Sequence, residues 1–233
     1  FGEETEDGGY EPFSLYSMRQ AIEEGFILDV LQNYTTYQGY FNLLKTIDAN
    51  PEFEESKAKR LLKSFVDSHE LVISTKTEII VEHFVEEVMH RIDGKAKAML
   101  VTGSREQVVK YKRAFDKYLS ENNYDFEALA AFSEFEYEGE KLSEKDVNKD
   151  LDVKVEDRFE DDDSRIIIVA NKFQTGFDQP LLHTMYVDKK LGGVRAVQTL
   201  SRLNRTHPDK EDTMVVDFKN DPEDIQQAFE DFY

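Results

Sequence analysis

The 233-residue chain is 39% hydrophobic and 33% charged, a composition that can bury a sizeable globular core. It has no cysteine, which excludes disulfide frameworks, thiolate zinc sites and thiol nucleophiles. With 29 lysines and arginines against 49 aspartates and glutamates, its formal net charge of −20 argues against broad nucleic-acid binding by its surface.

The N-terminal part of the chain is expected to be helical. Residues 1–11 are acidic and glycine-rich, which predicts a flexible entry segment and is the opposite of a secretory signal. Apolar spacing predicts three helices, over residues 14–31, 54–67 and 74–92. In the third helix two adjacent apolar rows predict a broad buried stripe, made of Ile80, Phe84, Val88, Val81, Val85 and Met89. His83 and His90 fall on the polar side of this helix, so we expect both to be solvated.

Strands alternate with helices in the rest of the chain. Short apolar runs predict five strands, over residues 98–101, 128–132, 166–169, 185–187 and 214–216. Helices are predicted after the cap Ser104, over residues 194–205, and from Pro222 onward. This alternation predicts an α/β fold, a parallel sheet flanked by helices and preceded by a helical N-terminal segment.

We therefore expect two regions. Residues 1–95 would form the helical N-terminal segment, and residues 96–233 would form the sheet domain. A highly charged stretch at about residues 134–163 is predicted to be a solvated insertion with one short helix around residues 153–159.

A polar loop follows the predicted strand over residues 166–169. It has the sequence Asn-Lys-Phe-Gln-Thr-Gly-Phe-Asp-Gln-Pro. Ligands bind at the carboxyl ends of parallel strands, Gly176 permits close backbone approach, and Asp178 can accept hydrogen bonds from a ribose or an arginine. The same residues suit a tight loop in which Asp178 caps a turn and Pro180 ends it, so position alone leaves both interpretations open.

Three long donor side chains share one face of the predicted helix over residues 194–205. Gln198 and Arg202 are four positions apart, and Arg202 and Arg205 are three apart. Such a set suits an anion with several oxygens, for example a triphosphate. An exposed basic helix face that pairs with the many carboxylates of this chain is the alternative.

A third candidate lies between the strand over residues 98–101 and the helix after it. Backbone N–H groups at the start of a helix attract phosphate, and Arg105 adds a positive charge. The residues concerned are Thr102, Gly103, Ser104 and Arg105. The alternative is an ordinary capped helix.

Other catalytic and metal motifs are missing from the sequence. There is no G-x-x-x-x-G-K-[ST], no strand followed by an Asp-Glu pair that would hold Mg²⁺, and no H-E-x-x-H among the five histidines. The acidic run 156–163 is more typical of a solvated surface than of a metal site. We expect no metal site in this chain and, without an apolar run of about 18 residues, no membrane span.

Taken in chain order, residues 102–105, the polar loop and residues 198–205 resemble motifs IV, V and VI of superfamily 2 helicases. Residues 198–205 fit Q-x-x-G-R-x-x-R with Ser201 where glycine is usual, and residues 175–178 fit an abbreviated T-x-G-x-D-like loop. More specifically, the chain resembles the second RecA-like motor domain of the R (restriction, HsdR) subunit of type I restriction enzymes. The stretches that carry this likeness are residues 16–31, 33–37, 169–180 and the motif VI helix.

The resemblance implies that the intact subunit hydrolyses ATP between two RecA-like domains, translocates double-stranded DNA, and cuts it with a nuclease domain further upstream. This chain lacks Walker and nuclease motifs and begins without Met, so we expect a half-motor excised from a longer protein and inactive alone. ATP and Mg²⁺ would be held mainly by the first RecA-like domain. The methylation (M) and specificity (S) subunits would be partners, in the cytoplasm.

The resemblance also implies residue roles. Arg205 would be an arginine finger for the γ-phosphate, Arg202 a second γ-phosphate or interdomain contact, and Gln198 a group that orients water or senses the γ-phosphate. On the loop, Gly176 and Asp178 would lie on the nucleotide side. The residues expected to contact DNA are Lys172 and Thr175 on that loop, and Thr102, Gly103, Ser104 and Arg105, which would grip a backbone phosphate.

Two other classes of protein stay open. One is a different superfamily 2 motor, such as a repair translocase or an RNA helicase. The other is a non-catalytic acidic interaction module, which would bury Gln198, Arg202 and Arg205 in pairs with carboxylates. For a motor, the cations at strand ends and on one helix face predict that only one edge of this acidic domain contacts DNA.

Overall fold

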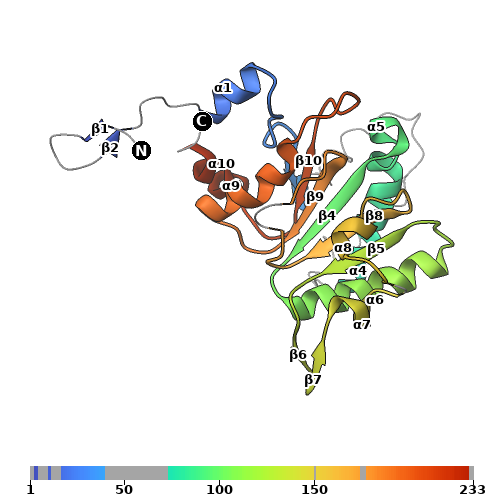
Figure 1. Cartoon of the computed structure of the whole chain (residues 1–233). Coiled ribbons are helices and arrows are strands. Elements are labelled where there is room, and N and C mark those ends of the chain that lie inside the picture. Colours follow the sequence, from blue (N-terminus) through green and yellow to red (C-terminus); the bar gives the residue numbers. More distant parts are fainter. Residues whose placement is uncertain are drawn as a thin grey trace.

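The computed structural model describes residues 3–4, 10–11, 17–39, 73–149, 151–173 and 177–230. Its centre is a six-stranded sheet in which all described neighbours pair in parallel (Figure 1). The strand order is β3 (Tyr34–Thr36), β10 (Met214–Asp217), β9 (Leu182–Asp188), β4 (Lys97–Thr102), β8 (Ser164–Val169) and β5 (Glu127–Ala131). All five strands predicted after residue 96 are confirmed.

The inner strands are buried on both faces. Every residue of β4, β8 and β9 is buried, as continuous runs of apolar residues predict for the middle of a parallel sheet. At the β5 edge, the side-chain amide of Asn148 hydrogen-bonds both the N–H and the C=O of Ala130, at 2.7 and 2.8 Å. This contact occupies backbone groups that an edge strand would otherwise leave open.

Helices cover the sheet on both faces, which makes three layers. Ala98, Leu100 and Ile168 point to a cluster formed with α4 (Ile73–His83), the π-helix η1 (Phe84–Val88) and α6 (Arg105–Glu121). Met99 and Ile167 point to the opposite cluster. That cluster includes α8 (Val155–Arg158), α9 (Val194–Leu200), η2 (Ser201–Asn204) and α10 (Pro222–Glu230).

The helix predicted over residues 14–31 is much shorter than expected. Only α1 (Met18–Glu23) forms, after the cap Ser17. Gly25 ends it, because its φ of +75° is left-handed and its N–H bonds the carbonyl of Ile22. Phe26, placed by periodicity on the apolar row, is therefore 67% exposed.

The third predicted helix is confirmed with interruptions, since α4, η1 and α5 (Arg91–Gly94) occupy residues 73–94. The predicted helix over residues 54–67 lies outside the described residues. Within the acidic entry segment, β1 (Glu3–Glu4) and β2 (Tyr10–Glu11) pair as a short antiparallel ladder.

The charged stretch 134–163 is more ordered and more buried than predicted. It contains a hairpin of β6 (Phe135–Tyr137) and β7 (Glu140–Leu142), which projects from the body in Figure 1, and α7 (Glu144–Val147). The expected short helix is confirmed as α8. Val155 and Phe159 are fully buried, so the charged stretch is anchored in the core at these two residues. The sequence pattern did not indicate that these two residues are buried, because all the residues of α8 except Val155 are ionisable.

Two pieces of the N-terminal 95 residues pack with the sheet. The strand β3 pairs with β10, and α4 packs against α6 and the sheet. A division of the chain into residues 1–95 and 96–233 stays a proposal. Within the described residues, no helix is long and apolar enough to cross a membrane.

His83 is buried, which corrects the prediction that it is solvated. It is 1% exposed, and its Nδ1 lies 2.7 Å from the hydroxyl of Tyr186 on β9. Burial, followed by the nearby His183, lowers the pKa of His83 to about 3. The sequence pattern failed here because the end of α4 is buried on more than one side, and β9 supplies a polar partner for His83.

Buried His83 is expected to make the fold acid-sensitive. At pH values between about 3 and 6.5, the unfolded chain binds a proton at this histidine that the folded chain does not. The free energy of unfolding therefore decreases as the pH is lowered through this range. Urea titrations from pH 7 to 4 should show a shallower fall for His83→Gln than for the parent chain. The same change at exposed His90 is the control, and equal slopes for all three proteins would contradict the prediction.

Candidate functional site

The polar loop after β8 crosses the sheet from one end of the strands to the other. It leaves the carboxyl end of β8 at Ala170 and reaches Leu181, whose carbonyl accepts a hydrogen bond from the N–H of Lys97 at the amino end of β4. Phe177 packs into the cluster beneath α9, so the loop runs over that face. Residues 174–176 lie outside the described residues, and the structure therefore gives no position for Thr175 or Gly176.

The structure joins the loop to the predicted motif VI residues. Arg205 Nε donates to Asp178 Oδ1 at 2.9 Å, and both side chains are exposed, by 47% and 69%. Behind this pair, Arg202 Nη1 lies 3.5 Å from the carbonyl of Phe177. Burial lowers the pKa of Arg202, as does the neighbouring Arg205 charge, while Asp178 raises it. Two arginines are thus held together on the loop side of α9.

The predicted single helix over residues 194–205 is wrong in its last turn. The α-helix α9 ends at Leu200, η2 continues as a 3-10 helix, and Arg205 has extended backbone angles (φ −61°, ψ 129°). A 3-10 helix has about 3 residues per turn, so the side chains of Gln198, Arg202 and Arg205 do not follow one α-helical face. Gln198 is exposed and Arg202 is half-buried.

The pair Arg205–Asp178 lies toward the amino ends of the strands. Asp178 is close in sequence to Leu181, whose carbonyl bonds Lys97 at the start of β4, and the carbonyl of Arg205 accepts from Lys210. The candidate residues at Thr102 to Arg105 lie instead at the carboxyl end of β4. The structure thus separates the predicted residues into two groups, with Arg202 and Arg205 toward the amino ends of the strands and Arg105 at the carboxyl end of β4.

The start of α6 is an ordinary capped helix. Ser104 accepts from the N–H of Gln107 at 3.2 Å, and the side chain of Gln107 accepts from the N–H of Gly103 at 2.8 Å. Thr102 is fully buried, with its hydroxyl 3.2 Å from the carbonyl of Val169. Only Arg105 of this group presents an exposed side chain. Its guanidinium lies 4.8 Å above the ring of Phe135 and donates to the carbonyl of Glu134 at 3.2 Å.

Lys172 is held by two carboxylates. Its Nζ lies 2.8 Å from Glu144 and 3.2 Å from Glu156, and its side chain is 25% exposed. Helices α7 and α8 of the charged stretch thus contact the loop, and their carboxylates compensate the charge of Lys172.

A buried ionic cluster was missed by the sequence analysis. Asp188, at the carboxyl end of β9, is 3% exposed and lies 2.6 Å from Nζ of Lys76 on α4. The hydroxyl of Tyr111 on α6 donates to the other carboxylate oxygen at 2.7 Å. Burial lowers the pKa of Lys76, and Asp188 opposes that effect. The sequence could indicate Asp188, because an aspartate directly after a predicted strand is visible in it. It could not indicate the partners of Asp188, because they come from two helices that are distant in the chain.

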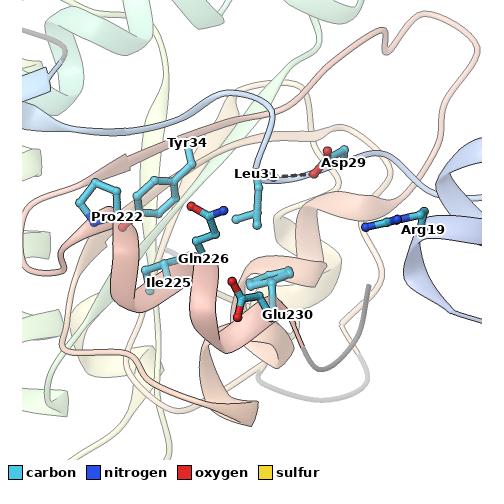
Figure 2. Close-up of a pocket in the computed structure, with 9 residues that line it drawn as sticks. Arg19, Asp29, Leu31, Tyr34, Pro222, Ile225, Gln226 and Glu230 are labelled. Atoms are coloured by element: carbon cyan, nitrogen blue, oxygen red, sulfur yellow. Dashed lines mark hydrogen bonds between the residues drawn. The ribbon is translucent and has the colours of Figure 1, made fainter.

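The structure also contains a cavity away from all these residues. Its volume is about 610 Å³. Figure 2 shows residues that line it, from the segment around Leu31 and from helix α10. None of its lining residues is one of the predicted candidates. In the part of the chain that the structure describes, no three His, Asp or Glu side chains gather as a metal site would require.

Comparisons with known proteins agree with this architecture. Residues 129–220 match the family described as type I restriction enzyme subunit R domain 3. The MjaVIIP protein of Methanocaldococcus jannaschii, named as a type I restriction enzyme endonuclease subunit, is 33% identical over 193 residues, which cover 76% of this chain and 16% of that protein. The HindI endonuclease subunit of Haemophilus influenzae is 26% identical over 98% of this chain and 23% of its own length.

A solved structure has the same fold. A fragment described as an HsdR subunit from Vibrio vulnificus matches with a TM-score of 0.50 and 18% identity, over 95% of this chain and 36% of that chain. The fold is RecA-like, a parallel sheet with helices on both faces. The chain spans less than a quarter of the curated relatives that it matches. These matches place the chain in the family of R (HsdR) subunits of type I restriction enzymes.

Proposed function

We propose that this chain is the second half of an ATP-dependent DNA translocase motor within an R subunit. The observation that carries the proposal is the exposed Arg205, held 2.9 Å from Asp178 with Arg202 behind it. An exposed arginine beside a polar loop, with a half-buried arginine behind it, suits an anion that approaches from another domain. The names of the relatives supply the context of restriction.

The nucleotide would lie between this face and the first RecA-like domain of the same subunit. Arg205 would exchange Asp178 for the γ-phosphate and stabilise the charge that develops during transfer. Arg202 would make a second γ-phosphate or interdomain contact, and Gln198 would orient water. The donor set fits the outer side of a triphosphate, since it offers two guanidinium groups. When bound, ATP with Mg²⁺ supplies the phosphoryl group, and both would be held mainly by the first domain, with Gly176 and Asp178 on this side.

DNA would contact the other end of the strands. Arg105 is exposed there, at the carboxyl end of β4, and Thr102, Gly103 and Ser104 place it. Lys172 would reach DNA only by leaving Glu144 and Glu156, and Thr175 would be a further DNA contact. Contacts of this kind hold phosphates without reading sequence, as a translocase requires.

The intact protein would work with methylation and specificity subunits in the cytoplasm and carry its nuclease residues in another domain. A non-catalytic acidic module is the competing proposal. It predicts that the arginines are buried in ion pairs, whereas the Arg205 pair is largely exposed.

The isolated chain is expected to show no measurable ATP hydrolysis, with or without double-stranded DNA, because it holds only one wall of the proposed site. The intact R subunit, assembled with its partner subunits, is expected to hydrolyse ATP when DNA is added. Phosphate release measured on both proteins tests this. Robust turnover by the isolated chain would contradict the half-motor proposal.

A further inference from the structure

The backbone that carries Arg205 is held by an unusual set of hydrogen bonds. The carbonyls of Leu203 and Arg205 each accept from Nζ of Lys210 at 2.8 Å. The carbonyl of Asn204 between them accepts from the N–H of Leu28 at 3.1 Å. Carbonyls at the end of a helix lack intrahelical partners, so these three bonds complete the end of η2.

Lys210 reaches this position from a tight turn. Its own N–H bonds the carbonyl of His207 at 3.0 Å, and the residue is only 5% exposed. Its ammonium lies where the chain leaves η2, since Leu203 is helical and Arg205 is extended. One buried group therefore holds both sides of the bend from which the Arg205 side chain projects.

The surroundings of the ammonium are mixed in charge. Burial lowers the pKa of Lys210 to about 7, the Arg205 charge lowers it as well, and Asp212 raises it. The ionisable side chains around the adjacent cavity of about 220 Å³ are His90, Arg91, Asp93, His183, Asp209, Glu211 and Asp212. Burying an ammonium here costs stability, which an apolar side chain of similar size would avoid. A requirement for its two hydrogen bonds would explain a lysine at this position.

We propose that Lys210 is a positioning residue for Arg205. Its two hydrogen bonds to the carbonyls of Leu203 and Arg205 fix the bend, so that the guanidinium of Arg205 points at the γ-phosphate. This inference rests on the proposed function, because it needs Arg205 to act on ATP. It concerns kcat rather than ATP affinity, because displacement of a group that acts mainly in the transition state lowers turnover more than binding.

The chain offers a matched control in Lys97. This lysine is 1% exposed, and its Nζ donates to the carbonyls of Asp161 and Ser164, both at 2.7 Å. It therefore closes a bend by the same chemistry, but on the segment that leads from α8 into β8. Lys97→Met and Lys210→Met should change stability by comparable amounts, because both remove a buried ammonium, and only the second touches the backbone of Arg205.

The test compares variants of the intact R subunit in its assembled complex, with DNA-stimulated ATP hydrolysis normalised to the folded fraction. Lys210→Met is expected to lower kcat by about 10- to 100-fold, since an error of about 1 Å in placement can cost that much. KM for ATP should change by no more than about 2-fold. Lys210→Arg, which keeps a cation with several donors, should recover part of the loss, and Lys97→Met should leave kcat unchanged.

A double variant separates positioning from general damage. If Lys210 acts through Arg205, then Lys210→Met combined with Arg205→Ala should be no slower than Arg205→Ala alone. Multiplied losses, or equal kcat for Lys210→Met and Lys97→Met, would overturn the inference. A different result, near-normal turnover by Arg205→Ala alone, would overturn the proposed function itself.

Discussion

Replacing Arg205 with alanine in the intact R subunit is expected to lower ATP turnover by about 10³- to 10⁵-fold, the usual effect of removing an arginine finger. Nucleotide binding should largely survive, because the first RecA-like domain would hold most of the phosphate contacts. The guanidinium is 47% exposed and is paired with Asp178, which itself is 69% exposed. Such a pair contributes little to folding stability, so the loss should be catalytic.

The measurement is steady-state ATP hydrolysis with saturating DNA, alongside direct nucleotide binding. Arg195→Ala is the matched control, because Arg195 is an exposed arginine on the first turns of α9. It should leave turnover within about 2-fold of the parent, as expected of a surface cation outside the site. Near-normal turnover by Arg205→Ala would remove the finger assignment, and a loss of nucleotide binding that matches the loss of turnover would assign Arg205 to ground-state binding.

The second large effect concerns stability. Asp188→Asn is expected to lower the free energy of unfolding by about 3–5 kcal/mol, because it leaves the Lys76 ammonium buried without its counter-charge. Asparagine keeps nearly the same shape and can still accept from the Tyr111 hydroxyl. Nζ of Lys219 lies 3.9 Å from Oδ1 of Asp188 and adds a second positive charge beside the same carboxylate.

Chemical denaturation of the chain at pH 7 measures this difference. The loss should shrink as the pH rises toward 10.5, the usual pKa of lysine, because a Lys76 without its counter-charge can release its proton in the folded state. The control is Glu121→Gln, which breaks the surface pair with Lys117 (3.9 Å; side chains 74% and 61% exposed) and should change stability by less than about 0.5 kcal/mol. Equal effects of the two variants would contradict a structural role for the buried pair.

The elements of the sheet domain could be predicted from local pattern. Continuous apolar runs gave β4 and β8, and Ser104 and Pro222 marked helix starts, because strand burial and capping depend on residues within a few positions. The same reasoning failed where the phase of a helix changes. It extended α1 past Gly25, missed the π-turn that follows His83, and continued α9 through η2 to Arg205.

The candidate site divides in the same way. The residues of the loop and of motif VI could be found from type and spacing, and the likeness to R subunits that they carry is confirmed by the family match. Their positions relative to the sheet could not be predicted from the sequence. The loop crosses one face of the sheet, so Asp178 and Arg205 lie near the amino ends of the strands while Arg105 lies at the carboxyl end of β4.

By itself the sequence determined the α/β fold, five of the six strands of the central sheet, and the family to which the chain belongs, since these follow from periodicity and from motifs that are contiguous in the chain. Only the tertiary structure decided which ions are buried and what holds Arg205. Lys76 meets Asp188 across 112 positions, and Asp178 meets Arg205 across 27. Such pairings arise from packing between distant elements, where the loss of water makes each polar group depend on a partner that local pattern does not reveal.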